Sequence, residues 1–205
     1  MFHRIEDVLK DLVQGKPIIV ADGLNRENEG DLVALAEKAT PSLVNFMITH
    51  ARGFICCPIT AERANELHLD VMVAKNSDPL GTAFTVSVDH DTNTTGGSAY
   101  ERSDTIRALA SADTKPWDLR RPGHIFPTIA KPGGVLEREG HTEAAIDLAK
   151  LCGAYPAAVT CEIMNANGLM ARRPELHQFA ETHNLKWITV QQVVDHFRGG
   201  KLFKC

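Results

Sequence analysis

Hydrophobic residues recur along the chain with two periods, one typical of helices and the other of strands. Ile5, Val8, Leu9 and Leu12 are spaced three or four residues apart, which predicts an amphipathic helix over residues 5–12. Similar spacing, together with threonine and proline start signals, predicts helices at residues 41–50, 61–67, 99–112, 142–151, 174–182 and 190–197. Short apolar or alternating runs predict strands at residues 18–21, 54–57, 82–88, 157–164 and 187–188.

Two local features refine this pattern. Thr189 and Gln192 have the spacing of a capping box, and Thr142 is expected at the start of its helix. Residues 113–140 are rich in proline, glycine and basic residues. We therefore predict a loop there, with at most a short strand near Ile125.

Helices and strands intermix along the whole chain, with no repeat, low-complexity segment or linker that would divide it. A chain of 205 residues is long enough for one domain with a sizeable core. We predict an α+β protein in which residues 1–205 form a single domain. The expected architecture is a three-layer α/β/α arrangement, with a mixed, twisted sheet covered by helices on both faces.

The composition narrows the classes of function. A net charge of -4 gives no electrostatic reason to expect nucleic acid or an anionic membrane as a partner. No apolar stretch is long enough to span a bilayer, and Glu6 and Asp7 stand where a signal peptide has its apolar segment. The five cysteines are odd in number and include no C-x-x-C pair, which indicates a reduced, cytoplasmic compartment and no structural zinc.

An acidic cluster follows the first predicted strand. Arg26, Glu27, Glu29 and Asp31 lie within six positions, and the carboxylates repel one another unless a cation or polar ligand lies among them. Their hard oxygen atoms suit magnesium or manganese, and the arginine can bind a phosphate or carboxylate. The alternative is a solvated acidic turn, the usual fate of such a run.

A second cluster lies where the long polar stretch becomes a helix. Arg138 can bind a phosphate, and Thr142 adds a hydroxyl and an N–H group at a helix start, which favours anions. Gly140 and His141 lie between them, and a neutral histidine can bind a metal. Taken singly, Thr142 could be a simple N-cap, and His141 a surface or core histidine.

Two further residues suit acid–base chemistry. Glu162 interrupts an apolar strand, where a carboxylate is costly to bury unless it has a function or a partner. His124 lies among prolines and a glycine that fix the backbone around its ring. The alternatives are that Glu162 faces solvent or pairs with an arginine, and that His124 bonds a backbone carbonyl.

Six short stretches, in order along the chain, carry a family resemblance. They are Arg26–Leu32, Gly81–Val86, Arg121–Pro127, Gly133–Leu136, Gly140–Ala144 and Cys161–Asn165. Together they resemble the 3,4-dihydroxy-2-butanone 4-phosphate synthase family of riboflavin biosynthesis. The resemblance covers roughly residues 5–197.

The resemblance implies an enzyme that converts D-ribulose 5-phosphate to 3,4-dihydroxy-2-butanone 4-phosphate and formate, by enolisation and skeletal rearrangement. It implies a homodimer with an active site near the subunit interface. It also implies magnesium or manganese, two ions per site, and no organic cofactor. By motif, Glu27 and His141 would bind metal, and His124 and Glu162 would be catalytic. The substrate-binding residues would be Arg26, Asp31, Arg138, Gly140 and Thr142.

Two positions depart from the family pattern. Leu24 stands where an acidic residue is expected, which puts in question any role of that position. Glu101 stands where aspartate is usual, an exchange that we expect to be tolerated. Many relatives continue into a GTP cyclohydrolase II domain whose cysteine cluster this sequence lacks, so we expect the synthase alone.

Two other functions are compatible with the residues alone. A different metal-dependent sugar-phosphate enzyme, such as an isomerase or aldolase, would use the same acidic loop, histidine and phosphate site. Product analysis separates the two, because only the synthase releases formate. A non-catalytic nucleotide- or RNA-binding module could share the layered architecture, since fold does not fix function. The acidic net charge argues against RNA.

Overall fold

The central strands bury both of their faces, so the sheet has to be covered on each side. In the computed structural model, which describes residues 2–199, Ile18 and Val20 of β1 (Ile18–Ala21) pack into one hydrophobic core. Ile19 and Ala21 pack into the other. Because successive side chains of a strand point to opposite faces, two layers of helices are needed.

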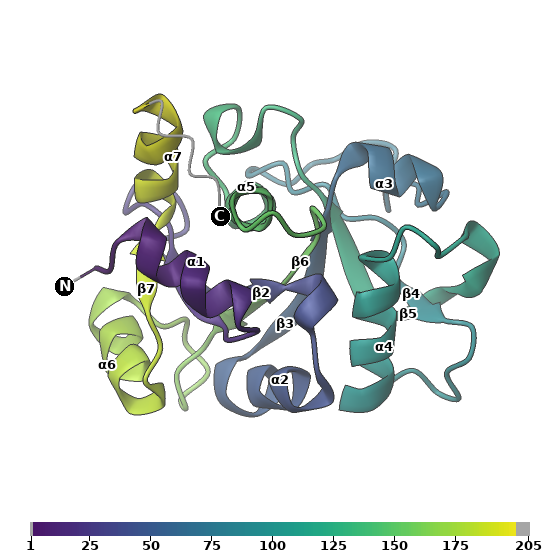
Figure 1. Ribbon diagram of the computed structural model, residues 1–205, viewed down its shortest axis with the longest axis horizontal. Helices are drawn as coiled ribbons and strands as arrows, with labels where there is room; N and C mark the ends of the chain where they lie inside the picture. The colour runs from purple at the N-terminus through teal and green to yellow at the C-terminus, as the bar shows by residue number, and fades with distance from the viewer. Residues whose placement is uncertain (1, 200–205) are drawn as a thin grey trace.

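Within the described residues the strands form one mixed sheet in the order β4-β5-β3-β6-β2-β1-β7 (Figure 1). The pairs β1–β7 and β3–β5 are parallel, and the other neighbours are antiparallel. Besides β1, the strands are β2 (Gly30–Leu35), β3 (Arg52–Ile59), β4 (Val88–His90), β5 (Leu119–Ile129), β6 (Ala158–Ile163) and β7 (Trp187–Thr189). The mixed sheet that we expected is confirmed.

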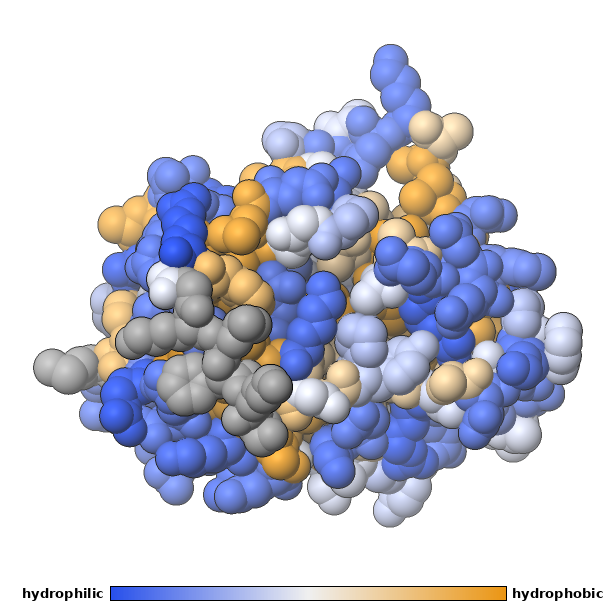
Figure 2. Space-filling model, turned by 45° about the horizontal axis from the view of Figure 1, so that its top comes forward, coloured by the Kyte–Doolittle hydropathy of each residue, from blue (hydrophilic) through white to orange (hydrophobic). Residues whose placement is uncertain are grey.

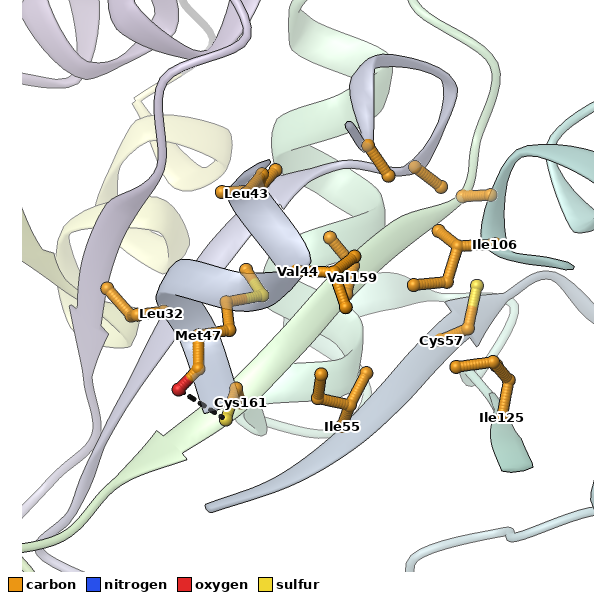
Figure 3. Packing of buried hydrophobic residues seen from close by; sticks show 14 of the residues in the cluster. Leu32, Leu43, Val44, Met47, Ile55, Cys57, Ile106, Ile125, Val159 and Cys161 are labelled. Carbon is orange, nitrogen blue, oxygen red and sulfur yellow. Dashed lines mark hydrogen bonds between the residues drawn. The ribbon is translucent and has the colours of Figure 1, made fainter. Parts of the chain in front are cut away.

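The helices divide between the two faces. One layer contains α1 (Ile5–Val13), α5 (His141–Leu151) and α7 (Val190–Arg198). The other contains α2 (Pro41–Phe46), α3 (Ala61–Glu66), α4 (Ala99–Leu109) and α6 (Arg173–His183). Figure 3 shows the second core, where Val44 and Met47 share a cluster with Ile55 and Val159 of the sheet. The predicted α+β, three-layer architecture is therefore confirmed.

The surface is polar over most of the face in Figure 2, with apolar residues in separate groups. Among the described residues, no helix has the length and apolar character needed to cross a membrane. Cys56, Cys57 and Cys161 are buried thiols, and Cys205 lies outside the described residues.

Two strand predictions were wrong. Residues 119–129 form the 11-residue strand β5, although proline, glycine and arginine content predicted a loop. The strand forms because β3 and β4 pair with it on its two edges, a long-range contact that local composition does not encode. Residues 82–88 contribute only isolated bridges at Phe84 and Thr85 before β4 begins at Val88. Strand β2 was not predicted, because its polar start, Gly30 and Asp31, resembles the preceding loop.

Helix starts follow the sequence more closely. Thr40 and Thr60 accept hydrogen bonds from the N–H groups three residues later, each at 3.1 Å. The capping box of Thr189 and Gln192 is confirmed. Helix α5 begins one residue before the expected start, with Gly140 in the N-cap position. Thr142 is therefore inside the first turn, which excludes the simple N-cap interpretation.

Candidate active site

A cavity of about 260 Å³ opens where the first turn of α5 meets the middle strands of the sheet. It collects most of the residues that the sequence singled out. The lining residues are Arg26, Glu27, Glu29, Asp31, Cys56, Asp78, Leu80, Thr82, Phe84, Thr128, Arg138, His141, Thr142, Thr160 and Glu162. Residues far apart in the sequence thus share one concave site, and concave sites with convergent polar groups are typical of small-molecule binding.

The acidic loop connects β1 to β2 in a hairpin formed by residues 22–29. The buried carboxylate of Asp22 accepts the backbone N–H groups of Glu27 at 3.0 Å and Glu29 at 2.9 Å. It also accepts a guanidinium hydrogen bond from Arg26 at 3.0 Å. An aspartate that accepts several local N–H groups fixes a turn. Asp22 therefore fixes the backbone of the loop that carries the Glu27 side chain.

A second contact holds the same loop from outside. The guanidinium of Arg172, at the start of α6, donates to the backbone carbonyls of Glu27 and Asn28, each at 2.7 Å. It also lies 3.7 Å from the Glu29 carboxylate. Asn28 adopts a left-handed conformation with φ of 55°, which asparagine tolerates better than most residues. Arg172 thus connects the acidic loop to α6, which lies on the opposite face of the sheet from α5.

Strand pairing places two carboxylates side by side. In the register of β2 and β6, Asp31 lies opposite Glu162, and directly opposite residues share one face of a sheet. One Glu162 oxygen accepts the backbone N–H of Phe54 at 2.7 Å. A Cβ atom at Gly53 would overlap the backbone and carboxylate of Glu162. No arginine within residues 2–199 pairs with Glu162, which lines the cavity instead.

The first residue of α5 is surrounded by acids. His141 Nδ1 lies 3.4 Å from a Glu27 oxygen and 3.9 Å from an Asp31 oxygen. Burial lowers the pKa of His141, but the negative charges of Asp31 and Glu27 outweigh this effect and raise it to about 9. The hydrogen bond from His141 lowers the pKa of Glu27. Burial, with the nearby charge of Glu162, raises the pKa of Asp31.

The donor atoms of this group fit a divalent cation. Ligand atoms of Asp22, Glu27 and His141 lie within 4.8 Å of one another. Within the described part of the chain, the buried atoms His141 Nε2 and Asp31 Oδ1 have no hydrogen-bond partner. Buried polar atoms are normally paired, so both atoms are available to bind a ligand. Both oxygens of Asp22 already hold the loop, which leaves Glu27 and His141 as the better-placed donors.

Arg138 lines the cavity beside Leu80 and Thr82. Its guanidinium donates to the Glu143 carboxylate at 2.6 Å. It also donates to the Leu80 carbonyl at 3.1 Å and the Thr82 hydroxyl at 3.0 Å. These contacts orient the side chain next to the helix start, a position that attracts anions.

Glycine at the N-cap of α5 has a steric reason. A Cβ atom at Gly140 would overlap the Arg138 guanidinium and crowd the Glu143 carboxylate. Gly140 is not among the residues that line the cavity, and its lack of a side chain lets Arg138 pack against the helix start. Thr142, in the first turn of the helix, is largely buried and lines the cavity.

His124 is the one predicted catalytic residue that the structure does not bring to the cavity. It lies on β5, and β3 separates this strand from the β6 strand that carries Glu162. The rings of Phe54 on β3 and Phe126 on β5 pack together with centroids 4.5 Å apart. The ring of His124 bonds a carboxylate, Asp89, and not the backbone carbonyl considered from the sequence.

Sequence reasoning missed several contributors to the site. Asp22 carried a usable signal, because an aspartate directly after a buried strand often accepts the N–H groups of the turn that follows. Arg172 and Thr128 carried none, because each is brought to the site only by tertiary packing. Cys56 lines the cavity too, and burial raises the pKa of its thiol far above the usual value.

A profile of the 3,4-dihydroxy-2-butanone 4-phosphate synthase family matches residues 6–196. The chain belongs to this family. Its relatives include the riboflavin biosynthesis protein RibBA of Bacillus mycoides (strain KBAB4), which is 58% identical over 198 residues. That match covers 97% of this chain and 50% of the relative, so the chain spans about half the length of the curated relatives it matches.

Solved synthase structures share the fold. A synthase in complex with two magnesium ions is 41% identical with a TM-score of 0.92, and the match covers 97% of this chain and 98% of that one. RibBX of A. baumannii, a two-domain 3,4-dihydroxy-2-butanone 4-phosphate synthase, is 47% identical with a TM-score of 0.92. This match covers 96% of this chain and 58% of RibBX.

The two departures from the synthase pattern have different surroundings. Leu24 is 70% exposed at the tip of the acidic loop. Glu101 accepts hydrogen bonds from the backbone and hydroxyl of Thr94 and from the hydroxyl of Ser98. The bonds from Thr94, as the largest cause, lower the pKa of Glu101 to about 2. Glu101 therefore holds the Thr94–Ser98 loop.

Proposed function

We propose that this chain converts D-ribulose 5-phosphate to 3,4-dihydroxy-2-butanone 4-phosphate and formate in riboflavin biosynthesis, as a metal-dependent lyase. The observation that carries the proposal is the cavity that combines Glu27, His141, Asp31 and Glu162 with Arg138. Membership of the synthase family supports it. We extend the proposal to a single synthase domain over residues 1–205.

The start of α5 serves as the phosphate end of the site. The first-turn N–H groups and the positive end of the helix dipole attract an anion, and Arg138 adds a forked donor. Thr142 contributes its hydroxyl to the same group. Arg26 and Asp31, which line the other part of the cavity, are the residues that we assign to the hydroxyl and ketone oxygens.

Glu162 is the residue that we assign to proton transfer in the cavity. The reaction begins by removing a proton from a carbon next to the ketone, which needs a base within reach of that carbon. The Phe54 N–H group fixes the position of the Glu162 carboxylate, and Asp31 lies opposite it.

The metal site that we propose consists of Glu27 and His141, with Asp31 beside them. A bound magnesium or manganese ion supplies positive charge that stabilises negative charge developing on the substrate oxygens. We propose two ions per site, and the solved synthase in complex with two magnesium ions supports this number. No organic cofactor is required by this chemistry.

We propose further that the chain forms a cytoplasmic homodimer and that His124 acts in the cavity of the partner subunit. The support is that His124 does not line the cavity of its own chain and that its side chain is 46% exposed. Mixing His124→Ala with Glu162→Gln tests this, because each heterodimer would contain one intact site. Equal mixing should restore about a quarter of wild-type activity. Absence of recovery in verified heterodimers would refute action across the interface.

The reaction itself is tested by product analysis. Purified protein is incubated with ribulose 5-phosphate and magnesium, and formate is measured with an EDTA-treated control. Metal-dependent release of formate is the expected result. Isomerised or cleaved sugar phosphate without formate would instead assign the chain to another class of sugar-phosphate enzyme.

A further inference from the structure

Among the residues that the structure describes, the ring of His124 has one hydrogen-bond partner, and that partner also holds the backbone. His124 Nδ1 lies 2.8 Å from Asp89 Oδ2. The backbone N–H of His124 donates to Asp89 Oδ1 at 2.9 Å. One carboxylate therefore fixes both the position of the residue and the rotation of its ring.

Asp89 is itself tightly enclosed. It lies on β4, is 6% exposed, and approaches two glycines. A Cβ atom at Gly96, where φ is 83°, would overlap the Asp89 carboxylate. A Cβ atom at Gly123 would overlap the backbone of Val88 and Asp89. The carboxylate thus has little freedom to leave His124.

The other edge of the ring is open. The His124 side chain is 46% exposed, and even a Cβ atom at the neighbouring Gly97 would stand 3.7 Å from Nε2. Within residues 2–199, His124 Nε2 has no protein hydrogen-bond partner. Because Asp89 can only accept when ionised, Nδ1 carries the proton of the neutral ring and Nε2 carries the free lone pair.

We propose that Asp89 is a positioning residue for the synthase reaction, which holds His124 in the Nδ1–H tautomer so that Nε2 exchanges protons with substrate. The carboxylate also stabilises the imidazolium that forms when Nε2 accepts a proton. This inference rests on the proposed function, because it needs His124 to act in catalysis. It goes beyond that function by assigning the proton-transfer atom and the residue that selects it.

The test compares Asp89→Asn with wild type. The amide oxygen can still accept the backbone N–H group, but the amide nitrogen would donate to Nδ1 and force the opposite tautomer. We expect kcat to fall about a hundredfold or more, with KM for ribulose 5-phosphate changed less than about threefold. Asp91→Asn, which removes an exposed carboxylate near His90, is the matched control and should retain full activity.

A second measurement does not depend on turnover. Nitrogen-15 NMR of the imidazole rings reports which nitrogen is protonated, and His124→Gln assigns the signal. The expected result is the Nδ1–H tautomer in wild type and the Nε2–H tautomer in Asp89→Asn. An Nε2–H tautomer in wild type overturns the proposal even if the variant fails to fold. An unchanged kcat in a folded Asp89→Asn protein also overturns it. If wild type makes no formate, the proposed function fails, while the tautomer still reports on Asp89.

Discussion

Replacement of Arg172 by methionine should weaken metal-dependent activity although Arg172 does not line the cavity. Its guanidinium reaches from the start of α6 to the carbonyls of Glu27 and Asn28, each at 2.7 Å. Methionine keeps the length of the side chain but donates no hydrogen bond. The helix start should persist, because the backbone N–H of Arg172 donates to Glu175 at 3.0 Å.

The size of the effect follows from the two bonds. Hydrogen bonds from a charged donor contribute about 1.5–3 kcal/mol each when well shielded. The Arg172 side chain is 44% exposed, so solvent screening reduces each contribution to roughly 1 kcal/mol. Loss of both hydrogen bonds destabilises the ordered conformation of the loop by roughly 2 kcal/mol, which corresponds to about thirtyfold in an equilibrium constant. Because Glu27 lies in that loop, we expect most of this free-energy change to appear as weaker magnesium binding.

The assay is a magnesium titration of formate release at saturating substrate. The half-saturating magnesium concentration should rise about tenfold to thirtyfold in Arg172→Met and less in Arg172→Lys, which retains one donor group. Arg4→Met removes an exposed arginine that pairs with Asp7 on α1 and is the matched control. An unchanged titration in folded Arg172→Met would show that Asp22 alone holds the loop and would refute this reasoning.

Four further predictions concern the cavity itself. Glu162→Gln should retain the hydrogen bond from Phe54, leave thermal unfolding nearly unchanged, and reduce kcat by about a hundredfold or more; near-normal turnover would remove Glu162 from proton transfer. Gly53→Ala should lower both stability and activity, because its Cβ would displace Glu162, and an unfolding curve like that of wild type would contradict this. The pKa of His141, raised to about 9, means that metal binding displaces a proton, so magnesium affinity should rise about tenfold per pH unit up to about 9. In metal-free protein the same raised pKa adds stability that is fully present below about pH 6.5 and is lost as the pH rises through about 9. Magnesium titrations and denaturant unfolding curves, each measured from pH 6.5 to 9.5, test these two statements. His141→Gln should show neither pH dependence.

Much of the fold was predictable because its signals are local. The spacing of Ile5, Val8, Leu9 and Leu12 gave α1, and all four side chains are buried. Thr40 and Thr60 cap the helices that they precede, since capping needs only a hydroxyl and an N–H three residues later. Strand β5 was not predictable in the same way. Its prolines and glycine disfavour a strand locally, and only pairing with β3 and β4 overrides them.

The sequence by itself determined which residue types were available for chemistry: the acidic loop, the Arg138–Thr142 helix start and Glu162. Their spacing is local, so patterns along the chain reveal it. Only the tertiary structure decided which of them meet. The register of β2 and β6 places Asp31 opposite Glu162, and the same sheet keeps His124 away from them, with Asp89 as its partner. The physical reason is that strand order and register are set by burial on both faces of the sheet, a property of the whole chain and not of any one segment.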